Sequence, residues 1–256
     1  MKKCLGYNQP RYNSIILKMK NFLLSFALIF TLLGCSSIDL SAVPSSEQET
    51  QRILALGLSH EENLIEARKL DTPHKVAVVT LQLKNARDEK IQANIDEVES
   101  NKYADGVIIS GQNSKFIATE ISEELKNGVL DTDIDFLTYN LEGIKDLTSE
   151  SLNHKLNLKI IYNSKERRNY AHAIFCDKWN NCDDSKLLLN VDSVIASNCK
   201  NNNCDYTETM SLDISESFLM DSVDNGFSMR LISKKKTNKI VLSKPYLMGY
   251  LKSTQR

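Results

Sequence analysis

The stretch "LNLKIIY", residues 156–162, decides how the second half of the chain folds. Every second residue from Leu156 to Tyr162 is apolar, which is the period of a strand with one buried face. The turn-like "NSKERRN" comes directly after it, and residues 170–176 form another apolar run. This order predicts an antiparallel β-hairpin.

More strands are expected on the C-terminal side of this hairpin, because short apolar runs alternate there with turn signals. They cover residues 186–197, 205–214, 227–233 and 239–242. A short helical segment is expected at 215–221. Ser243 and Pro245 open a last helix that turns Tyr246, Leu247, Tyr250 and Leu251 toward the sheet. Residues 150–256 are therefore predicted to be an antiparallel β domain, either a sandwich or an open sheet covered by short helices.

The preceding part, residues 47–145, has a different pattern. Two capping boxes, Ser46 with Glu49 and Ser59 with Glu62, predict two short helices. The next segments are expected in the order strand, helix, strand, helix and strand, at residues 75–84, 86–102, 107–109, 117–125 and 134–141. That order predicts a small α/β (βαβαβ) domain with a parallel sheet, and an α+β fold class for the whole chain.

A polar loop in this α/β domain is the candidate ligand site. It contains Ser110, Gly111, Asn113 and Ser114, and it follows the predicted second strand. Ligands of parallel sheets gather at the carboxyl ends of strands, and a helix N-terminus can hold an anion. The simpler interpretation is that Asn113 or Ser114 only caps the next helix, because the glycine spacing of a phosphate-binding motif is absent.

An apolar run of about a dozen residues, 22–33, stands near the N-terminus. A membrane-crossing helix needs roughly 20 residues, so this run is too short to span a bilayer. Lys18 and Lys20 precede it, and no acidic residue occurs before Asp39. Charged flank and short apolar core together indicate a secretory signal peptide.

Leu32-Leu33-Gly34-Cys35, at the end of this run, resembles the lipobox of bacterial lipoproteins. The resemblance implies that residues 1–34 are a signal peptide and that Cys35 becomes the acylated first residue, carrying chains such as palmitate. Met19 would be a more usual start than Met1. Residues 35–46 are polar and small and form a flexible tether. Ser36 after the cysteine implies an outer-membrane lipoprotein that faces the periplasm.

Charge excludes one class of partner. The whole chain has 32 basic and 33 acidic residues, and five of the basic residues lie within positions 1–34. The mature part thus keeps 27 basic and 33 acidic residues, a net charge of about −6. This balance argues against nucleic acid as a partner. The expected partners are the membrane, through the lipid anchor, and a protein of the cell envelope.

The remaining cysteines fall in two close pairs, Cys176 with Cys182 and Cys199 with Cys204. Because exported chains meet an oxidising environment, we predict disulfide bonds. Local bridges are favoured, and Cys182 to Cys199 with Cys176 to Cys204 is the alternative. A four-cysteine zinc site is less compatible with the spacings, and neither pair has the spacing of a redox dithiol.

No catalytic motif is evident. The histidines His60, His74, His154 and His172 form no metal-binding pair, and no cofactor is expected. Asp131, Asp133 and Asp135 lack the rest of a calcium loop and are interpreted as solvated loop residues. Trp179, in the first cysteine loop, could contact a partner or fold back on the sheet. We expect a non-enzymatic binding, assembly or scaffold role in the cell envelope; the alternative is an envelope hydrolase or small-ligand-binding protein that uses the loop at Ser110.

Overall fold

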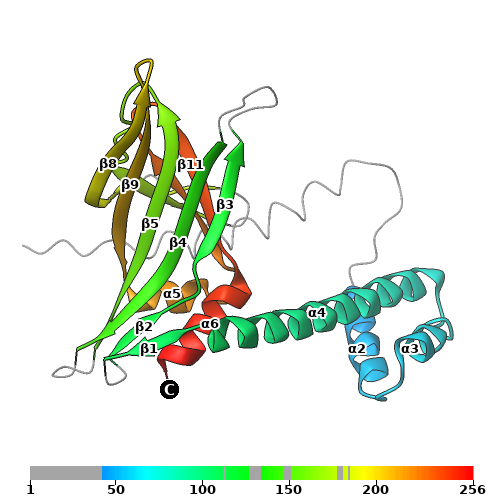
Figure 1. Cartoon of the computed structure of the whole chain (residues 1–256). Helices are drawn as coiled ribbons and strands as arrows, with labels where there is room; N and C mark the ends of the chain where they lie inside the picture. The colour runs from blue at the N-terminus through cyan, green and yellow to red at the C-terminus, as the bar shows by residue number, and fades with distance from the viewer. Residues whose placement is uncertain are drawn as a thin grey trace, which may run out of the picture. The chain divides into compact units, whose positions relative to one another are not determined.

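The computed structural model describes residues 42–111, 114–126, 134–146, 151–177, 181–183 and 185–255. The described residues form two compact units, which divide between Ala86 and Arg87. One long helix, α4 (Pro73–Asp105), contributes residues to both units. Figure 1 labels the elements. None of the helices in the described part combines the length and the apolarity that a membrane crossing requires.

The described part of the first unit is helical. It consists of α2 (Ala42–Leu54), α3 (His60–Ala67) and the first half of α4. The predicted capping box of Ser59 and Glu62 is confirmed, because each side chain accepts a hydrogen bond from the other residue's backbone N–H. The box predicted at Ser46 is wrong, because Ser46 is buried inside α2.

The strand predicted at residues 75–84 is also wrong, since this run is helical and belongs to α4. Val79 and Leu83 lie one helical turn apart, and both are buried with Ile53 and Ala67. The β-branched residues of this run have a low helix propensity, but that preference is weak and the burial of one helix face overrides it.

The second unit is rich in strands. Its larger sheet has seven strands: β1 (Ile108–Ser110), β2 (Lys115–Ile117), β3 (Ile121–Lys126), β4 (Ile134–Lys145), β5 (Leu152–Ser164), β8 (Asn190–Lys200) and β9 (Asn203–Ile214). Its smaller sheet has four: β6 (His172–Cys176), β7 (Leu187–Leu188), β10 (Phe227–Ile232) and β11 (Thr237–Leu242).

Both sheets are antiparallel. The larger one has the order β1-β2-β4-β5-β9-β8, with β3 also paired to β4, and the smaller one has the order β11-β10-β6-β7. The opening stretch "LNLKIIY" lies in the centre of β5, where Leu158 is opposite Tyr139 of β4 and Met210 of β9. Its alternate residues are buried as predicted. The chain is thus a mixed α+β protein with a strand-rich C-terminal part.

Several finer predictions for these segments are wrong. The segment 117–125 forms strands and no helix, so the parallel βαβαβ order is not what the described residues build. The domain boundary predicted between 145 and 150 falls between β4 and β5, which pair with each other. The predicted hairpin of β5 with β6 is absent, because β5 pairs with β4 and β9 while β6 pairs with β10. The alternation of apolar and polar residues indicates that a segment is a strand. Which strand it pairs with depends on segments far away in the sequence.

Two short helices complete the second unit, α5 (Glu216–Ser222) and α6 (Lys244–Thr254). Ser243 caps α6 as predicted, and Pro245 stands in its first turn. The four residues expected to face the sheet, Tyr246, Leu247, Tyr250 and Leu251, are all buried in the common core with side chains from both sheets. Figure 1 shows α5 and α6 next to each other in the lower part of the second unit.

Candidate functional site

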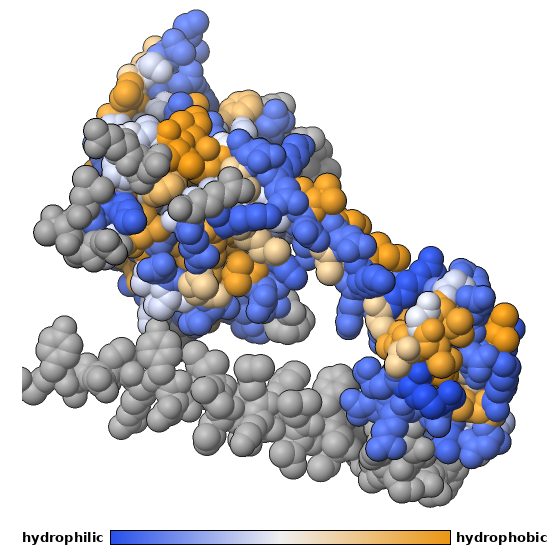
Figure 2. Space-filling view, turned by 90° about the horizontal axis from the view of Figure 1, so that it is seen from below, coloured by the Kyte–Doolittle hydropathy of each residue, from blue (hydrophilic) through white to orange (hydrophobic). Residues whose placement is uncertain are grey.

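A shallow groove of the second unit lies between three helices. It is a groove of about 510 Å³ beside α5, α6 and the C-terminal half of α4. Its apolar lining comes from Ala93, Met220, Val223, Met248 and Leu251, and its polar lining from Glu97, Ser100, Lys252 and Gln255. The face of the second unit drawn in Figure 2 carries hydrophobic patches between hydrophilic ones.

A close helix contact builds one wall of the groove. Gly249 of α6 lies against α4, and a Cβ atom at this position would stand 2.5 Å from the Ser100 carbonyl oxygen and 2.6 Å from Tyr103 Cβ. The Ser253 hydroxyl donates a hydrogen bond to the Ala104 carbonyl at 3.1 Å. The rings of Tyr103 and Tyr246 meet edge to face with centroids 5.2 Å apart. These contacts fix α6 on α4.

The other wall is α5. Ser215 caps this helix by accepting a hydrogen bond from the Phe218 N–H. Leu219 is fully buried, and this orientation leaves the next residue, Met220, 46% exposed at the groove. Methionine is flexible and polarisable, so it adapts to apolar partners of different shape. Among the described lining residues there is no histidine or cysteine. The groove is therefore suited to binding an apolar segment.

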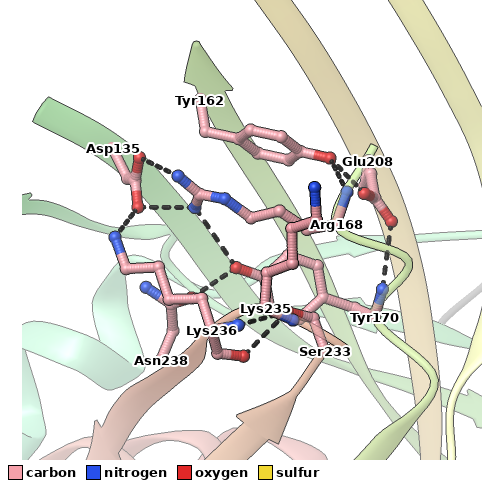
Figure 3. A network of polar contacts seen from close by, with 9 residues as sticks. All are labelled: Asp135, Tyr162, Arg168, Tyr170, Glu208, Ser233, Lys235, Lys236 and Asn238. Carbon is pink, nitrogen blue, oxygen red and sulfur yellow. Dashed lines mark hydrogen bonds and ion pairs between the residues drawn. The ribbon is translucent and has the colours of Figure 1, made fainter. Parts of the chain in front are cut away.

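A second feature is a buried polar network between the larger and the smaller sheet (Figure 3). Asp135 of β4 accepts two hydrogen bonds from the Arg168 guanidinium, at 2.7 and 2.9 Å, and it also pairs with Lys236. The same guanidinium lies 4.1 Å from the ring centroid of Tyr162. Asp135 is fully buried, so its interpretation as a solvated loop residue is wrong. Asp131 and Asp133 lie outside the described residues.

Glu208 of β9 is the second buried carboxylate of the network. It accepts hydrogen bonds from the Tyr162 hydroxyl and from the backbone N–H groups of Asn169 and Tyr170, both at 3.3 Å. Burial raises the pKa of Tyr170 to about 12, so this hydroxyl keeps its proton and donates a hydrogen bond to Oδ1 of Asn238 in β11.

The network connects the two sheets. Asp135, Tyr162 and Glu208 belong to the larger sheet, whereas Asn238 belongs to the smaller one. Each carboxylate is already paired or hydrogen-bonded inside the protein. Buried charges that satisfy one another hold a fold in one arrangement and leave no reactive group for a substrate. We therefore assign this network a structural role.

The predicted ligand loop at residues 110–114 joins two antiparallel strands and not a strand and a helix. Ser110 ends β1, and Ser114 precedes β2, which pairs with β1 as an antiparallel hairpin. The Ser114 hydroxyl donates a hydrogen bond to the Gly111 carbonyl, and Gly111 has a φ of +61°. The loop thus leads into a strand, so the helix N-terminus on which the expected anion site depended is absent from residues 114–126. Asn113 lies outside the described residues.

The histidines are not gathered into a site. His154 is buried in β5, with Nδ1 2.7 Å from the Tyr250 hydroxyl, and burial lowers its pKa. His172 lies in β6, while His60 and His74 lie in α3 and α4. Within the described ranges, no three His, Cys, Asp or Glu side chains are grouped so as to hold a metal ion.

The cysteines pair locally. Cys176 is bonded to Cys182 and Cys199 to Cys204, so the favoured pairing is confirmed over its alternative. The first bridge follows β6, and the second closes the turn between β8 and β9. Cys35 and Trp179 lie outside the described residues, so the predictions made for them stay predictions.

The comparisons with known proteins do not identify the chain: no family model matches it, and no curated protein matches it. Its function has to be argued from the site alone. Sequence reasoning missed the groove, because Ala93, Met220 and Met248 are far apart in the chain and no local motif connects them. The only available signal was the capped, apolar pattern of α6.

Proposed function

We propose that this chain is a lipid-anchored protein of the cell envelope whose strand-rich unit binds an apolar segment of another envelope protein. The groove beside α4, α5 and α6 is the binding site, and the role is assembly or scaffolding without catalysis. The single observation that carries this proposal is the groove itself, open on the surface and lined by Met220, Met248, Val223 and Leu251. Flexible methionine side chains are typical of surfaces that bind apolar protein segments.

The proposed anchor is Cys35, and two features support it. The first feature is the sequence around it, which resembles a lipobox. A lipoprotein of this kind carries more than one acyl chain, and two or more chains hold a protein on a membrane durably, whereas one binds only weakly. The two disulfide bonds of the folded part support this proposal, because such bonds are compatible with a chain that matures outside the reducing cytoplasm. Ser36 favours the outer membrane, with the folded part in the periplasm. The flexible tether predicted at residues 35–46 is too long, because residues 42–46 belong to α2 and Ser46 is buried, so the proposed tether is residues 35–41.

The polar lining suggests what the partner segment looks like. Glu97 of α4 and Lys252 of α6 bring one acidic and one basic group to the same groove. An amphipathic segment with apolar anchors and charges of both signs would fit this lining. The alternative of an envelope hydrolase has no matching observation, because its loop at Ser110 is a hairpin turn and His154 is buried elsewhere.

Photo-crosslinking in the native host tests the groove. A photoreactive amino acid at Met248 should give a discrete crosslinked band, because this side chain lines the groove. Met220→Glu should weaken the band about tenfold or more, since it places a charge where an apolar group of the partner binds. The measurement is the yield of the crosslinked species on a blot.

Val241→Glu is the matched control. Val241 is 48% exposed, close to the 46% of Met220, and it lies on β11 away from the groove lining. This control should leave the band unchanged. A band that survives Met220→Glu, or that Val241→Glu weakens equally, would contradict the proposed site.

A further inference from the structure

An exposed, uncharged loop connects α2 to α3 in the first unit. Residues 54–59 have the sequence Leu-Ala-Leu-Gly-Leu-Ser, and every one of them is exposed. Leu54, Leu56 and Leu58 are 37%, 48% and 39% exposed. Figure 2 shows hydrophobic residues gathered on the drawn face of this unit. We call residues 54–58 the leucine loop, and its exposed apolar side chains are typical of an interaction surface.

The leucine loop lies outside the small core of the first unit. Ile53, directly before it, is fully buried with Val79 and Leu83, whereas the three leucines are not part of that cluster. Gly57 has a φ of +66°, a conformation that glycine adopts freely. A Cβ atom at Gly57 would meet no other atom within 4 Å. The tip of the loop is therefore open to its surroundings.

The backbone of the leucine loop is suited to an apolar environment. Three consecutive N–H groups donate hydrogen bonds to carbonyls of the preceding turn: Ala55 to Gln51 at 2.9 Å, Leu56 to Ile53 at 3.1 Å and Gly57 to Leu54 at 3.2 Å. An unpaired N–H group is costly to place among lipid chains, because no water is there to accept its hydrogen bond. These three groups are already paired, so the loop tip can leave water without that cost.

The position of the leucine loop depends on the proposed anchor at Cys35, on which this inference rests. Helix α2 begins at Ala42, so the proposed tether of residues 35–41 spans at most about 25 Å. The 13 residues of α2 add about 20 Å. The loop at the end of α2 thus stays within about 45 Å of the bilayer in every orientation of the first unit. A tether of this reach keeps the loop at a high effective concentration near the lipid.

We propose that the leucine loop inserts into the surface of the bilayer that holds the anchor. Leu54, Leu56 and Leu58 then lie among the lipid chains at the headgroup boundary, and the first unit gains a second, weak attachment to the membrane.

The charges beside the loop select zwitterionic lipid. Glu61 and Glu62 follow the loop and are exposed, while Arg52 precedes it and pairs with Glu49 at 2.7 Å. A surface attracted to anionic lipid carries an excess of Lys and Arg, which these residues do not supply. Apolar contact therefore drives the insertion. A protein partner fits less well, because stable protein interfaces bury about 800 Å² on each side, more than a five-residue loop offers.

Quenching of tryptophan fluorescence by brominated lipid chains tests the insertion. The acylated full chain, purified from its host in mild detergent, is reconstituted into vesicles of phosphatidylcholine and phosphatidylethanolamine, with and without bromine on the chains. Leu56→Trp should add an emission that the brominated vesicles reduce about twofold or more, because the new ring lies at the headgroup boundary. Replacing Leu54 and Leu58 with Asn in this variant should remove about half of the quenching or more, since polar side chains resist transfer into lipid.

Val241→Trp is the matched control, because Val241 is 48% exposed like Leu56 and lies on β11 of the second unit. Its emission should be the same in both kinds of vesicle. All altered side chains are exposed, so far-ultraviolet circular dichroism should show unchanged folding.

The outcomes separate the loop from the anchor. A chain that floats with the vesicles while Leu56→Trp escapes quenching overturns the insertion and leaves the anchor intact. Equal quenching of Val241→Trp also overturns it, as does a discrete protein crosslink in the native host from a photoreactive residue in place of Leu56. A chain without acyl mass that does not float overturns the anchor, and the insertion with it.

Discussion

Replacing Asp135 with Asn should lower the free energy of unfolding by about 3–5 kcal/mol, the largest effect of any single substitution that we expect. Arg168 is only 7% exposed, and Lys236 pairs with the same carboxylate. The asparagine amide keeps the size of the side chain and removes the charge that both cations need. Equilibrium urea unfolding followed by circular dichroism measures the loss.

The matched control for Asp135→Asn is Glu166→Gln, which removes an exposed ion pair. The side chains of Glu166 and Lys235 are 71% and 51% exposed, so water screens their attraction. This control should change the stability by less than about 1 kcal/mol. If both variants lost the same small amount, the buried network would not hold the two sheets together as we describe.

Gly249→Ala should have the next largest effect, a loss of about 2–3 kcal/mol. The added methyl group would stand 2.5 Å from the Ser100 carbonyl oxygen, and that atom belongs to the backbone of α4 and cannot turn aside. Thermal or urea unfolding measures the change. The groove should also widen, so the crosslink from Met248 should weaken in the same variant.

The direction of the stability change in Gly249→Ala distinguishes a close helix contact from its absence. Alanine favours a helix over glycine by about 1 kcal/mol, so without the close contact this substitution would stabilise the protein. Lys252→Ala, on the same helix at an exposed position, should change stability by no more than about 0.5 kcal/mol. A more stable Gly249→Ala variant would show that α6 does not lie as close to α4 as described.

Local pattern was enough for the strands that have one buried face. The alternation through Leu156 and Ile160 predicted the centre of β5, and the capping residue Ser243 predicted the start of α6. Both depend on interactions within a few residues. The local disulfide pairing was predicted for the same reason, because the cysteines of each pair stand close together in the sequence. The coarse fold class followed from the strand patterns of the C-terminal part.

Pairing between distant segments could not be predicted in the same way. The run from residue 75 to 84 has the composition of a strand, but Val79 and Leu83 are buried at helical spacing against Ile53. The hydrogen bonds that join Asp135 to Arg168 link residues 33 positions apart. The groove combines side chains from three helices, and neither a period nor a motif in the sequence reports which helices meet.

The intact mass of the native protein, purified from the membranes of its own host, tests the central proposal most directly. We expect a mass that lacks residues 1–34, carries added acyl chains at Cys35 and does not change on treatment with an alkylating agent, because the four remaining cysteines are in disulfide bonds. An unprocessed, unacylated chain whose cysteines react with the agent would contradict the lipid anchor and the envelope location together.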